Sequence, residues 1–523
     1  CDATNWKEVR DMDFDTFDAR FRAERAQGFQ VVDFESYTTP SGQRYAAIWQ
    51  QMPPDRDWEV RIDLDMKWFL NAFHRYQDQG LRLIDFESYD TPTGVRYAGV
   101  WAENDARHDY AMAPVLDTAI ANYRATHVIP GISVVIMQDG EVVYRRGFGW
   151  ADSAEAKQAH AGTVYMTASV AKAIGATLAA KIQLQRDANG QPLIDLSRPT
   201  SDYVKVPSSH THTLEQLLRK HGCIWHYSDG GPQPTETYYR WQAEPVDSMQ
   251  GPMISRRLAN GTLLNCVPGQ FYHYSTHGFT FVGAALEKVT GKDLTTLIQD
   301  EIAGPFSLTS LRVAAPKIPV AVGPGGSWID RYEMAQGYHF NTTTNRVTEI
   351  QYEESSWKIL GGGLQSSAHD LAQFGWLTLD GKIAGNPDTE LWQAVTAPNT
   401  WVIPNPNPPP ATISEPNQTV GLAWVIRTLN ATTGSAPLPL RRIAEHGGTA
   451  PGARSQLQIY REAGCRLGSG GYGACASNPG QPRRVVVAIM TNTRFSPVAN
   501  NNTHPIQALS DRLGAIVLRN PPW

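Results

Sequence analysis

The sequence predicts an α/β protein of the α+β kind, in which helices flank an antiparallel sheet and form a helical subdomain, after a small α-β-β repeat domain. Two observations predict this architecture. A unit in the first hundred residues occurs twice, and the rest of the chain carries strand-like segments at both of its ends with helix-like segments between them. We therefore expect a tandem repeat domain over residues 1–105 and a larger domain over residues 106–523.

The duplicated unit dominates the N-terminal part. Residues 28–37 recur without gaps as residues 80–89, and the two copies span about residues 6–50 and 58–102. In each copy a helix-like segment ends at a glycine, which suits a helix C-cap, and two strands follow around a Pro-x-Gly turn. So small a unit can hardly bury its own apolar face. We expect it to pack on its twin or on the next domain, with its aromatic side chains in the core rather than on a carbohydrate or peptide platform.

The larger domain begins with an amphipathic helix from Ala113. Next, Asp139-Gly140 separates two apolar runs, which is a hairpin signal. A further helix follows Ser169, and a helix-rich middle extends to about residue 345. We expect the C-terminal part to complete the sheet with strand-like segments at residues 455–460 and 484–490.

Composition narrows the class of protein. Hydrophobic residues make up 41% of the chain and charged residues 19%, which is typical of a well-packed globular protein. The net charge is −5 and the basic residues form no stripe, so we expect no nucleic-acid partner. No apolar run approaches the roughly 18 residues that span a bilayer, so we expect no integral membrane segment.

The five cysteines favour an oxidising compartment. They contain no C-x-x-C, and four of them form two plausible pairs, Cys223 with Cys266 and Cys465 with Cys475. We therefore expect a secreted, extracellular protein. Cys1 is left over, and a lipid anchor through this residue is the alternative.

Ser169 and Lys172 form an S-x-x-K tetrad that opens a helix, one turn apart. The helix N-terminus favours a developing anion on the hydroxyl, and apolar neighbours favour a buried, neutral lysine that can accept the serine proton. A second tetrad, Ser355 to Lys358, runs into Gly361-Gly362-Gly363. Because glycines continue a helix poorly, we do not expect Lys358 to fold back on its serine.

Tyr274 is the candidate for the second proton-handling group, since a tyrosine held near a lysine can relay a proton to a leaving group. The segment around it, together with other motifs in the same order, resembles the serine β-lactamase-like family, which includes class C β-lactamases, DD-peptidases and related esterases. The resemblance covers roughly residues 110–520. The segments that carry it are Gly147-Phe148-Gly149, a degraded L-L-x-H-x-S-G at residues 217–222, Pro268 to Gly278 with Tyr274-Ser275-Thr276, Gly361 to Leu364, and His446-Gly447-Gly448 through Gly452.

The resemblance implies a serine hydrolase that forms an acyl-enzyme and needs no cofactor. It implies that Ser169 is the nucleophile, that Lys172 and Tyr274 share the proton transfer, and that the backbone N–H groups of Ser169 and Thr449 form the oxyanion hole. It also implies substrate-binding positions at Thr276, His446, Gly447 and Gly448.

Two of these positions depart from the family pattern. Thr276 stands where the family usually has asparagine, and His446 stands where true β-lactamases have a cationic lysine. A hydroxyl cannot bridge as an amide does, and a histidine binds a substrate carboxylate weakly or in a pH-dependent way. Both departures favour a peptidase or esterase. Six histidines between residues 210 and 277 could suggest a metal site, but without a zinc motif we expect no metal.

The repeats, joined to such a domain, resemble the polyglycine hydrolases, secreted endopeptidases that cut glycine-rich linkers. This resemblance implies a peptide or protein substrate. Two alternatives remain: an esterase, D-amino-acid amidase or β-lactamase-like enzyme for small substrates, and a non-catalytic binding protein with a decayed site. The joint presence of Ser169, Lys172 and Tyr274 speaks against decay.

Overall fold

The protein was analysed as a computed structural model. It describes residues 6–51, 58–78, 81–103, 110–154, 157–227, 238–249, 255–257, 263–269, 272–314, 334–341, 343–344, 346–393, 395–396, 419–429, 441–462, 465–467, 471–473, 484–498 and 504–520. Residues 104–109, around the predicted boundary between the two domains, and residues 404–416, which include six prolines, lie outside these residues.

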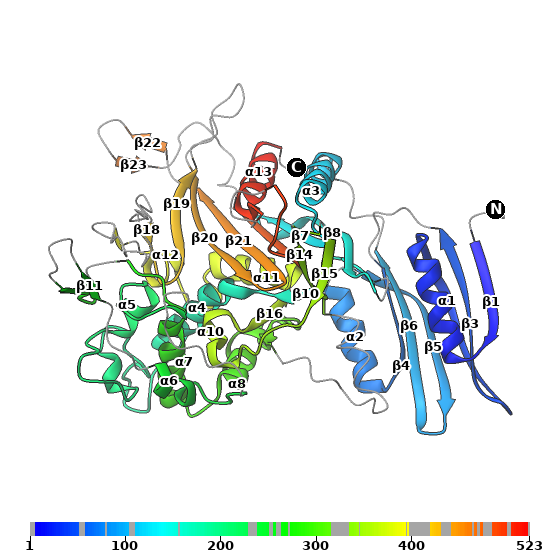
Figure 1. The fold of residues 1–523 in the computed structure, drawn as a ribbon, viewed down its shortest axis with the longest axis horizontal. Helices are drawn as coiled ribbons and strands as arrows, with labels where there is room; N and C mark the ends of the chain where they lie inside the picture. The colour runs from blue at the N-terminus through cyan, green and yellow to red at the C-terminus, as the bar shows by residue number, and fades with distance from the viewer. Residues whose placement is uncertain are drawn as a thin grey trace.

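The two N-terminal repeats have the same fold, with one more strand than the sequence predicts (Figure 1). Each is β-α-β-β rather than α-β-β, because a strand precedes the helix. In the first copy this strand is polar and buries only Met12, so its sequence gives little strand signal. In the second copy, apolar Trp58, Val60, Ile62 and Leu64 alternate with polar residues, so the sequence analysis overlooked a strand signal there. The sheets are antiparallel, with orders β1-β3-β2 and β4-β6-β5. The elements are β1 (Trp6–Met12), α1 (Phe14–Ala26), β2 (Phe29–Thr39) and β3 (Gly42–Gln51), then β4 (Trp58–Leu64), α2 (Met66–Asp78), β5 (Leu81–Thr91) and β6 (Gly94–Glu103).

The repeats pack on each other, as predicted. Phe17 of α1 and Val100 of β6 belong to one buried apolar cluster that draws on both copies. The backbone N–H of Phe34 donates to the Asp85 carboxylate of the second copy at 2.8 Å. Trp49 and Trp101 are fully buried, so these aromatic side chains form core, as expected.

The rest of the chain is built on a nine-stranded antiparallel sheet. Strands from early and late in the sequence lie side by side, as predicted, with β24 next to β7. Asp139 and Gly140 both have positive φ, 49° and 97°, which suits the tight hairpin turn expected between β7 and β8. In sheet order the strands are β17 (Val395–Thr396), β18 (Thr419–Val420), β19 (Val425–Leu429), β20 (Arg441–Ala450), β21 (Ala453–Glu462), β24 (Val485–Thr491), β7 (Gly131–Gln138), β8 (Glu141–Asp152) and β9 (Lys157–Gln158).

Helices cover both faces of this sheet (Figure 1). The helices α3 (Ala113–His127) and α13 (Ile506–Arg519) pack on one face, and α4 (Ala171–Leu184) and α11 (Ala368–Leu379) pack on the other. Every residue of β7 is buried. Val134 and Ile136 join the cluster beneath α3 and α13, whereas Val135 and Met137 join the cluster beneath α4 and α11, so the strand alternates between two cores.

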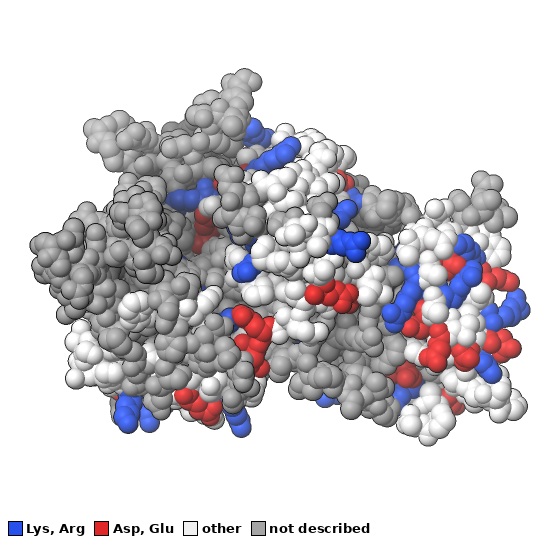
Figure 2. All heavy atoms as spheres, viewed as in Figure 1, with Lys and Arg blue, Asp and Glu red and all other residues white. Residues whose placement is uncertain are grey.

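The predicted helical subdomain is present, and its helices share a buried apolar cluster with α4, with small strands beside it. No helix among the described residues has the length and apolar character needed to cross a membrane. On the face shown in Figure 2, acidic and basic side chains are intermixed over the repeats. The remaining elements are β10 (Val164–Met166), η2 (Ala168–Val170), η3 (Thr200–Asp202), α5 (Leu214–Leu218), α6 (Ala243–Met249), β11 (Ser255–Arg257), β12 (Leu263–Asn265), α7 (His277–Thr290), α8 (Leu294–Ile298), η5 (Gln299–Ala303), β13 (Arg312–Val313), β14 (Gly337–Asn341), β15 (Arg346–Ile350), η6 (Ser356–Lys358), α10 (Ile359–Gly362), β16 (Leu364–Ser367), α12 (Pro387–Glu390), β22 (Cys465–Leu467) and β23 (Gly471–Gly473).

Candidate active site

Ser169 lies in a strained turn, η2, that leads directly into α4. Ala168, the residue before it, has a φ of 46°, a conformation that costs a non-glycine residue about 1–3 kcal/mol. The preceding Thr167 is held from two sides: its N–H donates to Leu364 O at 2.9 Å, and its carbonyl accepts from the Ser455 hydroxyl at 2.5 Å. The surrounding strands therefore fix Ser169 at the helix N-terminus.

Lys172 is fully buried one turn further on, and its Nζ has three polar neighbours. These are Ser169 Oγ at 3.2 Å, Thr276 Oγ1 at 3.1 Å and Gly361 O at 2.5 Å. Burial lowers the pKa of Lys172 well below its usual value, and the positive charges of Lys220 and Lys358 lower it further. A neutral amine has two N–H bonds, which suit Gly361 O and Thr276 Oγ1, and one lone pair, which remains for the Ser169 hydroxyl proton.

Tyr274 is the second residue, after Lys172, whose side chain contacts the Ser169 hydroxyl. Its hydroxyl donates to Ser169 Oγ at 2.7 Å, and its ring centroid lies 4.8 Å from Lys172 Nζ. Burial raises the pKa of Tyr274 above its usual value, so the phenol keeps its proton and acts as a donor. Ser169 Oγ thus accepts a hydrogen bond from a phenol while its own proton faces an amine. The structure brings together the three residues that the sequence motifs single out.

Thr276 directly precedes α7 and is buried at the base of the site. Besides its contact with Lys172, its N–H donates to His226 Nδ1 at 3.3 Å. A Cβ on Gly361 would lie 2.6 Å from Thr276 Cγ2, so only glycine lets this segment come close enough for its carbonyl to bind Lys172. The glycine run 361–363 follows the second S-x-x-K in sequence, but through Gly361 it contributes to the site around the first S-x-x-K. Lys358 of the second tetrad ion-pairs with Glu353.

Lys220 is a site residue that the sequence analysis missed. Its buried Nζ lies 3.2 Å from His446 Nε2, 3.1 Å from Ala423 O and 5.1 Å from the ring centroid of Tyr274. The signal that could have found it is its place in the degraded L-L-x-H-x-S-G segment, where Lys220 stands at the histidine position.

Both ring nitrogens of His446 contact protein atoms: Nδ1 lies 2.8 Å from Gly447 O, and Nε2 contacts Lys220. Burial lowers the pKa of His446 well below its usual value, and the charges of Lys220 and Lys172 lower it further. The imidazole is therefore neutral at ordinary pH. At the position of His446, the positive charge is therefore that of Lys220 rather than that of a protonated imidazole.

Strand β20, which carries His446-Gly447-Gly448, extends beyond the end of the neighbouring strand β19. It pairs with β19 as far as Glu445 and with β21 as far as Ala450. A Cβ on Gly448 would lie 2.3 Å from Thr167 O, so the strand backbone touches the turn that carries Ser169. This close approach places the backbone of Thr449 beside the nucleophile turn.

Replacing Gly448 with alanine should lower the unfolding free energy by about 1–3 kcal/mol and depress activity, because the new methyl group collides with backbone. Gly447→Ala is the matched control, since its Cβ would meet the end of the Gln456 side chain, which can move. Urea unfolding checks both variants, and ester hydrolysis checks Gly448→Ala. Equal losses of unfolding free energy at the two positions would contradict the close-approach argument.

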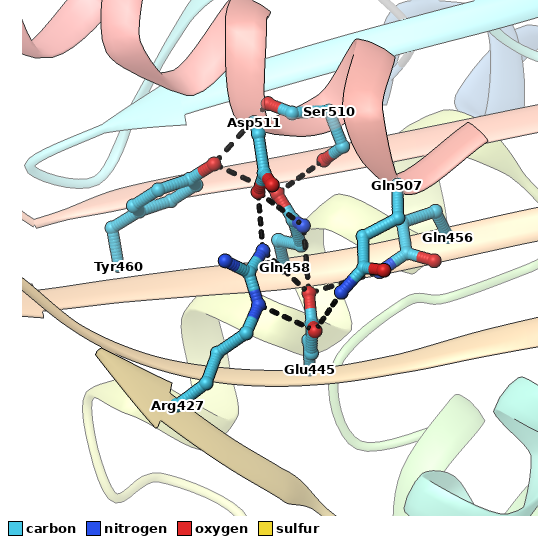
Figure 3. Close-up of polar contacts among 8 residues, drawn as sticks. All are labelled: Arg427, Glu445, Gln456, Gln458, Tyr460, Gln507, Ser510 and Asp511. Carbon is cyan, nitrogen blue, oxygen red and sulfur yellow. Dashed lines mark hydrogen bonds and ion pairs between the residues drawn. The ribbon is translucent and has the colours of Figure 1, made fainter. Parts of the chain in front are cut away.

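A partly buried polar network supports β20 just before His446 (Figure 3). The Glu445 carboxylate accepts two hydrogen bonds from Arg427 of β19, at 2.6 and 3.1 Å. It also accepts from the side-chain amides of Gln456 and Gln458 on β21 and of Gln507 on α13. The network continues from Arg427 and Gln458 to Asp511, and through Gln458 to Tyr460 and Ser510.

Cys223 and Cys266 form the first predicted disulfide, with 43 residues of sequence separation and a Cα–Cα distance of 5.8 Å. It joins the segment after Lys220 to the segment that leads to Tyr274. A loop of this length corresponds to about 4 kcal/mol of stabilisation in the chain-entropy account. The second predicted pair includes Cys475, which lies outside the described residues.

Comparison with known families agrees with this geometry. The β-lactamase family model matches residues 116–510. The chain belongs to this family. Members of the β-lactamase family are serine hydrolases, and this chain is one of them. Both N-terminal copies match a second model, described as a polyglycine hydrolase-like structural repeat, at residues 3–52 and 55–104.

Curated relatives in the β-lactamase family are distant. The human mitochondrial serine β-lactamase-like protein LACTB is 24% identical over 429 residues, 69% of this chain and 73% of that protein. The mouse protein is 28% identical over 252 residues, 47% of this chain, so the match spans only 42% of that relative. A putative D-alanyl-D-alanine carboxypeptidase of Escherichia coli O157:H7 is 24% identical over 338 residues, 59% of this chain and 72% of that protein.

Solved structures show the same fold. The octameric penicillin-binding protein homologue from Pyrococcus abyssi superposes with a TM-score of 0.53 at 18% identity, over 78% of each chain. The D-amino acid amidase from Ochrobactrum anthropi SV3 superposes with a TM-score of 0.52 at 16% identity, over 78% of this chain and 97% of that chain. Both agree with the predicted antiparallel sheet flanked by helices.

Proposed function

We propose that this chain is a secreted serine endopeptidase that cleaves glycine-rich linkers of a protein substrate through an acyl-enzyme on Ser169. The observation that carries the proposal is the combination, in one chain, of a β-lactamase-family site with two polyglycine hydrolase-like repeats. We further propose that residues 1–105 form the repeat domain and residues 106–523 the hydrolase domain. The disulfide between Cys223 and Cys266 supports an oxidising, extracellular setting.

The geometry supports a definite order of proton transfers. As Ser169 Oγ attacks the scissile carbonyl carbon, its proton passes to neutral Lys172. The oxyanion accepts hydrogen bonds from the backbone N–H groups of Ser169 and Thr449, each worth about 3–4 kcal/mol in the transition state. Tyr274 then gives its proton to the leaving nitrogen and recovers one from Lys172, and the C–N bond breaks to leave an ester on Ser169.

Water completes the cycle. It attacks the ester carbonyl while the amine and phenol pair takes its proton, and the C–O bond to Ser169 breaks as that proton returns to Oγ. The acid product leaves with the oxygen of water, and Ser169, Lys172 and Tyr274 regain their starting protonation states.

A substrate without side chains must be recognised through its backbone, and β20 offers a suitable edge. Its last five residues, 446–450, extend past β19 and lie against the Ser169 turn. An extended peptide can pair with such an edge by backbone hydrogen bonds. We assign Thr276, His446, Gly447 and Gly448 to the substrate-binding surface, and we assign the repeats to holding the rest of the protein substrate.

One alternative has a specific observation in its favour. A D-aminopeptidase of Gluconobacter oxydans is 24% identical over 295 residues, 56% of this chain and 50% of that protein. An esterase or D-amino-acid amidase acting on small substrates would use the same Ser169 chemistry without needing the repeats. The non-catalytic alternative leaves the convergence of Lys172 and Tyr274 on Ser169 without a purpose.

A direct substrate comparison tests the proposal. The full chain is incubated with a glycine-rich peptide, a D-amino-acid amide, a p-nitrophenyl ester and nitrocefin, and kcat/KM is measured for each. We expect internal cleavage of the glycine-rich peptide, with a kcat/KM above those for the amide and nitrocefin. Hydrolysis of the ester or the amide with an intact glycine-rich peptide would favour the small-substrate enzyme. A chain inert towards all four would favour a binding protein.

A further inference from the structure

We propose that Lys220 is a positioning residue of this site, which holds His446 as a neutral hydrogen-bond acceptor and keeps a fixed positive charge beside Tyr274 and Lys172. The inference rests on the proposed function, because it assigns a role within the same acylation site. It goes beyond the motif assignments, because Lys220 belongs to none of the three motifs that carry the nucleophile, the tyrosine or His446.

Hydrogen-bond chemistry fixes the state of His446. Gly447 O can only accept, so the ring nitrogen 2.8 Å away, Nδ1, must carry a hydrogen. In a neutral imidazole the other nitrogen, Nε2, is then an acceptor, and the Lys220 ammonium at 3.2 Å is its donor. A second hydrogen bond, to Ala423 O at 3.1 Å, holds the ammonium in place.

The position of Lys220 also makes it an electrostatic neighbour of the proton-handling pair. Its Nζ lies 5.1 Å from the ring centroid of Tyr274, within the range of a cation–π contact. The charge stabilises a phenol oxygen that becomes negative as it gives up its proton. It also favours the neutral form of Lys172, as the lowered pKa of that residue indicates.

Other titratable groups face the same space and belong in the interpretation of any pH profile. Lys358 adds a second positive charge near Lys172, moderated by its ion pair with Glu353. The ring of Tyr272 lies 6.0 Å from Lys220 Nζ, and the ring of His226 lies 5.3 Å from that of Tyr274. Of Lys220 and Lys358, Lys220 lowers the pKa of Lys172 more.

Labelling of Ser169 by a fluorophosphonate, followed against pH in the full chain, tests the role. Lys220→Met keeps the length of the side chain and removes its charge. We expect the acid-side midpoint of the labelling rate to move up by about one pH unit, and the rate near neutrality to fall about ten-fold. Lys220→Arg, which keeps the charge, should return the midpoint towards that of the wild type. An unchanged midpoint in Lys220→Met would overturn the inference.

Two controls separate this inference from its foundation. Lys181→Met removes a lysine charge from α4, the helix that carries Lys172. The ammonium of Lys181 donates to Glu301 O, and the labelling midpoint of this variant should match that of the wild type. If wild-type Ser169 is not labelled at any pH, the proposed function fails, whereas a labelled wild type with no shift in Lys220→Met refutes the role of Lys220 alone.

A measurement on the wild type keeps the inference testable even if Lys220→Met does not fold. Long-range ¹H–¹⁵N spectra of ¹⁵N-histidine-labelled protein report which ring nitrogen carries the hydrogen. We expect His446 to show a hydrogen on Nδ1 and to stay neutral through the pH range in which ordinary histidines titrate. A hydrogen on Nε2, or titration near the usual histidine pKa, would contradict the arrangement.

Discussion

Replacing Ser169 with alanine should abolish covalent labelling by a fluorophosphonate and lower kcat/KM about 10⁴- to 10⁶-fold, as expected when the nucleophile of a catalytic unit is removed. Its Oγ is the atom on which Lys172 and Tyr274 converge, at 3.2 and 2.7 Å. Peptide mapping by mass spectrometry identifies the labelled residue, and ester hydrolysis gives the rate.

Ser355→Ala is the matched control, because it alters the second S-x-x-K of the same chain. Ser355 is buried, and Lys358 of its tetrad pairs with Glu353. We expect labelling and turnover to match the wild type. A label that persists in Ser169→Ala, or that maps to Ser355, would refute the assignment of the nucleophile.

Replacing Lys172 with methionine should lower kcat/KM about 10²- to 10⁴-fold, since it removes the base that accepts the Ser169 proton. The same variant should change how stability depends on pH. The folded pKa of Lys172 lies well below the value of about 10.4 in the unfolded chain, so between these two values the unfolded chain holds one more proton than the folded protein.

The sign of this effect follows from proton linkage. Where the unfolded state binds more protons, the unfolding free energy rises with pH, here by up to about 1.4 kcal/mol per pH unit from this one group. Urea unfolding of wild type and Lys172→Met across neutral and alkaline pH measures the difference. We expect the wild type to gain stability relative to the variant as pH rises towards 10. Parallel curves would show that Lys172 has an ordinary pKa.

The fold could be predicted where a sequence segment is duplicated or where a turn motif lies between two apolar runs. The gapless duplication gave the repeats and their mutual packing, and the Asp139-Gly140 turn gave the β7–β8 hairpin. The first strand of the first repeat was missed because β1 is polar and mostly exposed. In the second repeat, Trp58, Val60, Ile62 and Leu64 of β4 do alternate with polar residues, and this strand signal was overlooked.

The site could be predicted as far as its motifs extend. Ser169, Lys172 and Tyr274 each lie in a recognisable segment, and the structure brings them together. Lys220 could not be assigned a role in this way, because its segment is degraded and its partners, Ala423 and His446, lie more than 200 residues away. Glu445 could not be assigned a role either, because its partners come from two strands and the helix α13 and no local motif links them.

The order of strands in the sheet has a consequence for biosynthesis. The turn bearing Ser169 follows β10, but the strand against which it rests, β20 (Arg441–Ala450), is synthesised much later. The strand β24 must also insert between β21 and β7 before the sheet is continuous. α13, still later, supplies Gln507 and Asp511 to the network around Glu445. A nascent chain on the ribosome therefore carries Ser169 and Lys172 before the strand that bears Thr449 and the network that supports it have been synthesised. The complete arrangement around Ser169 forms only after translation has delivered these last elements.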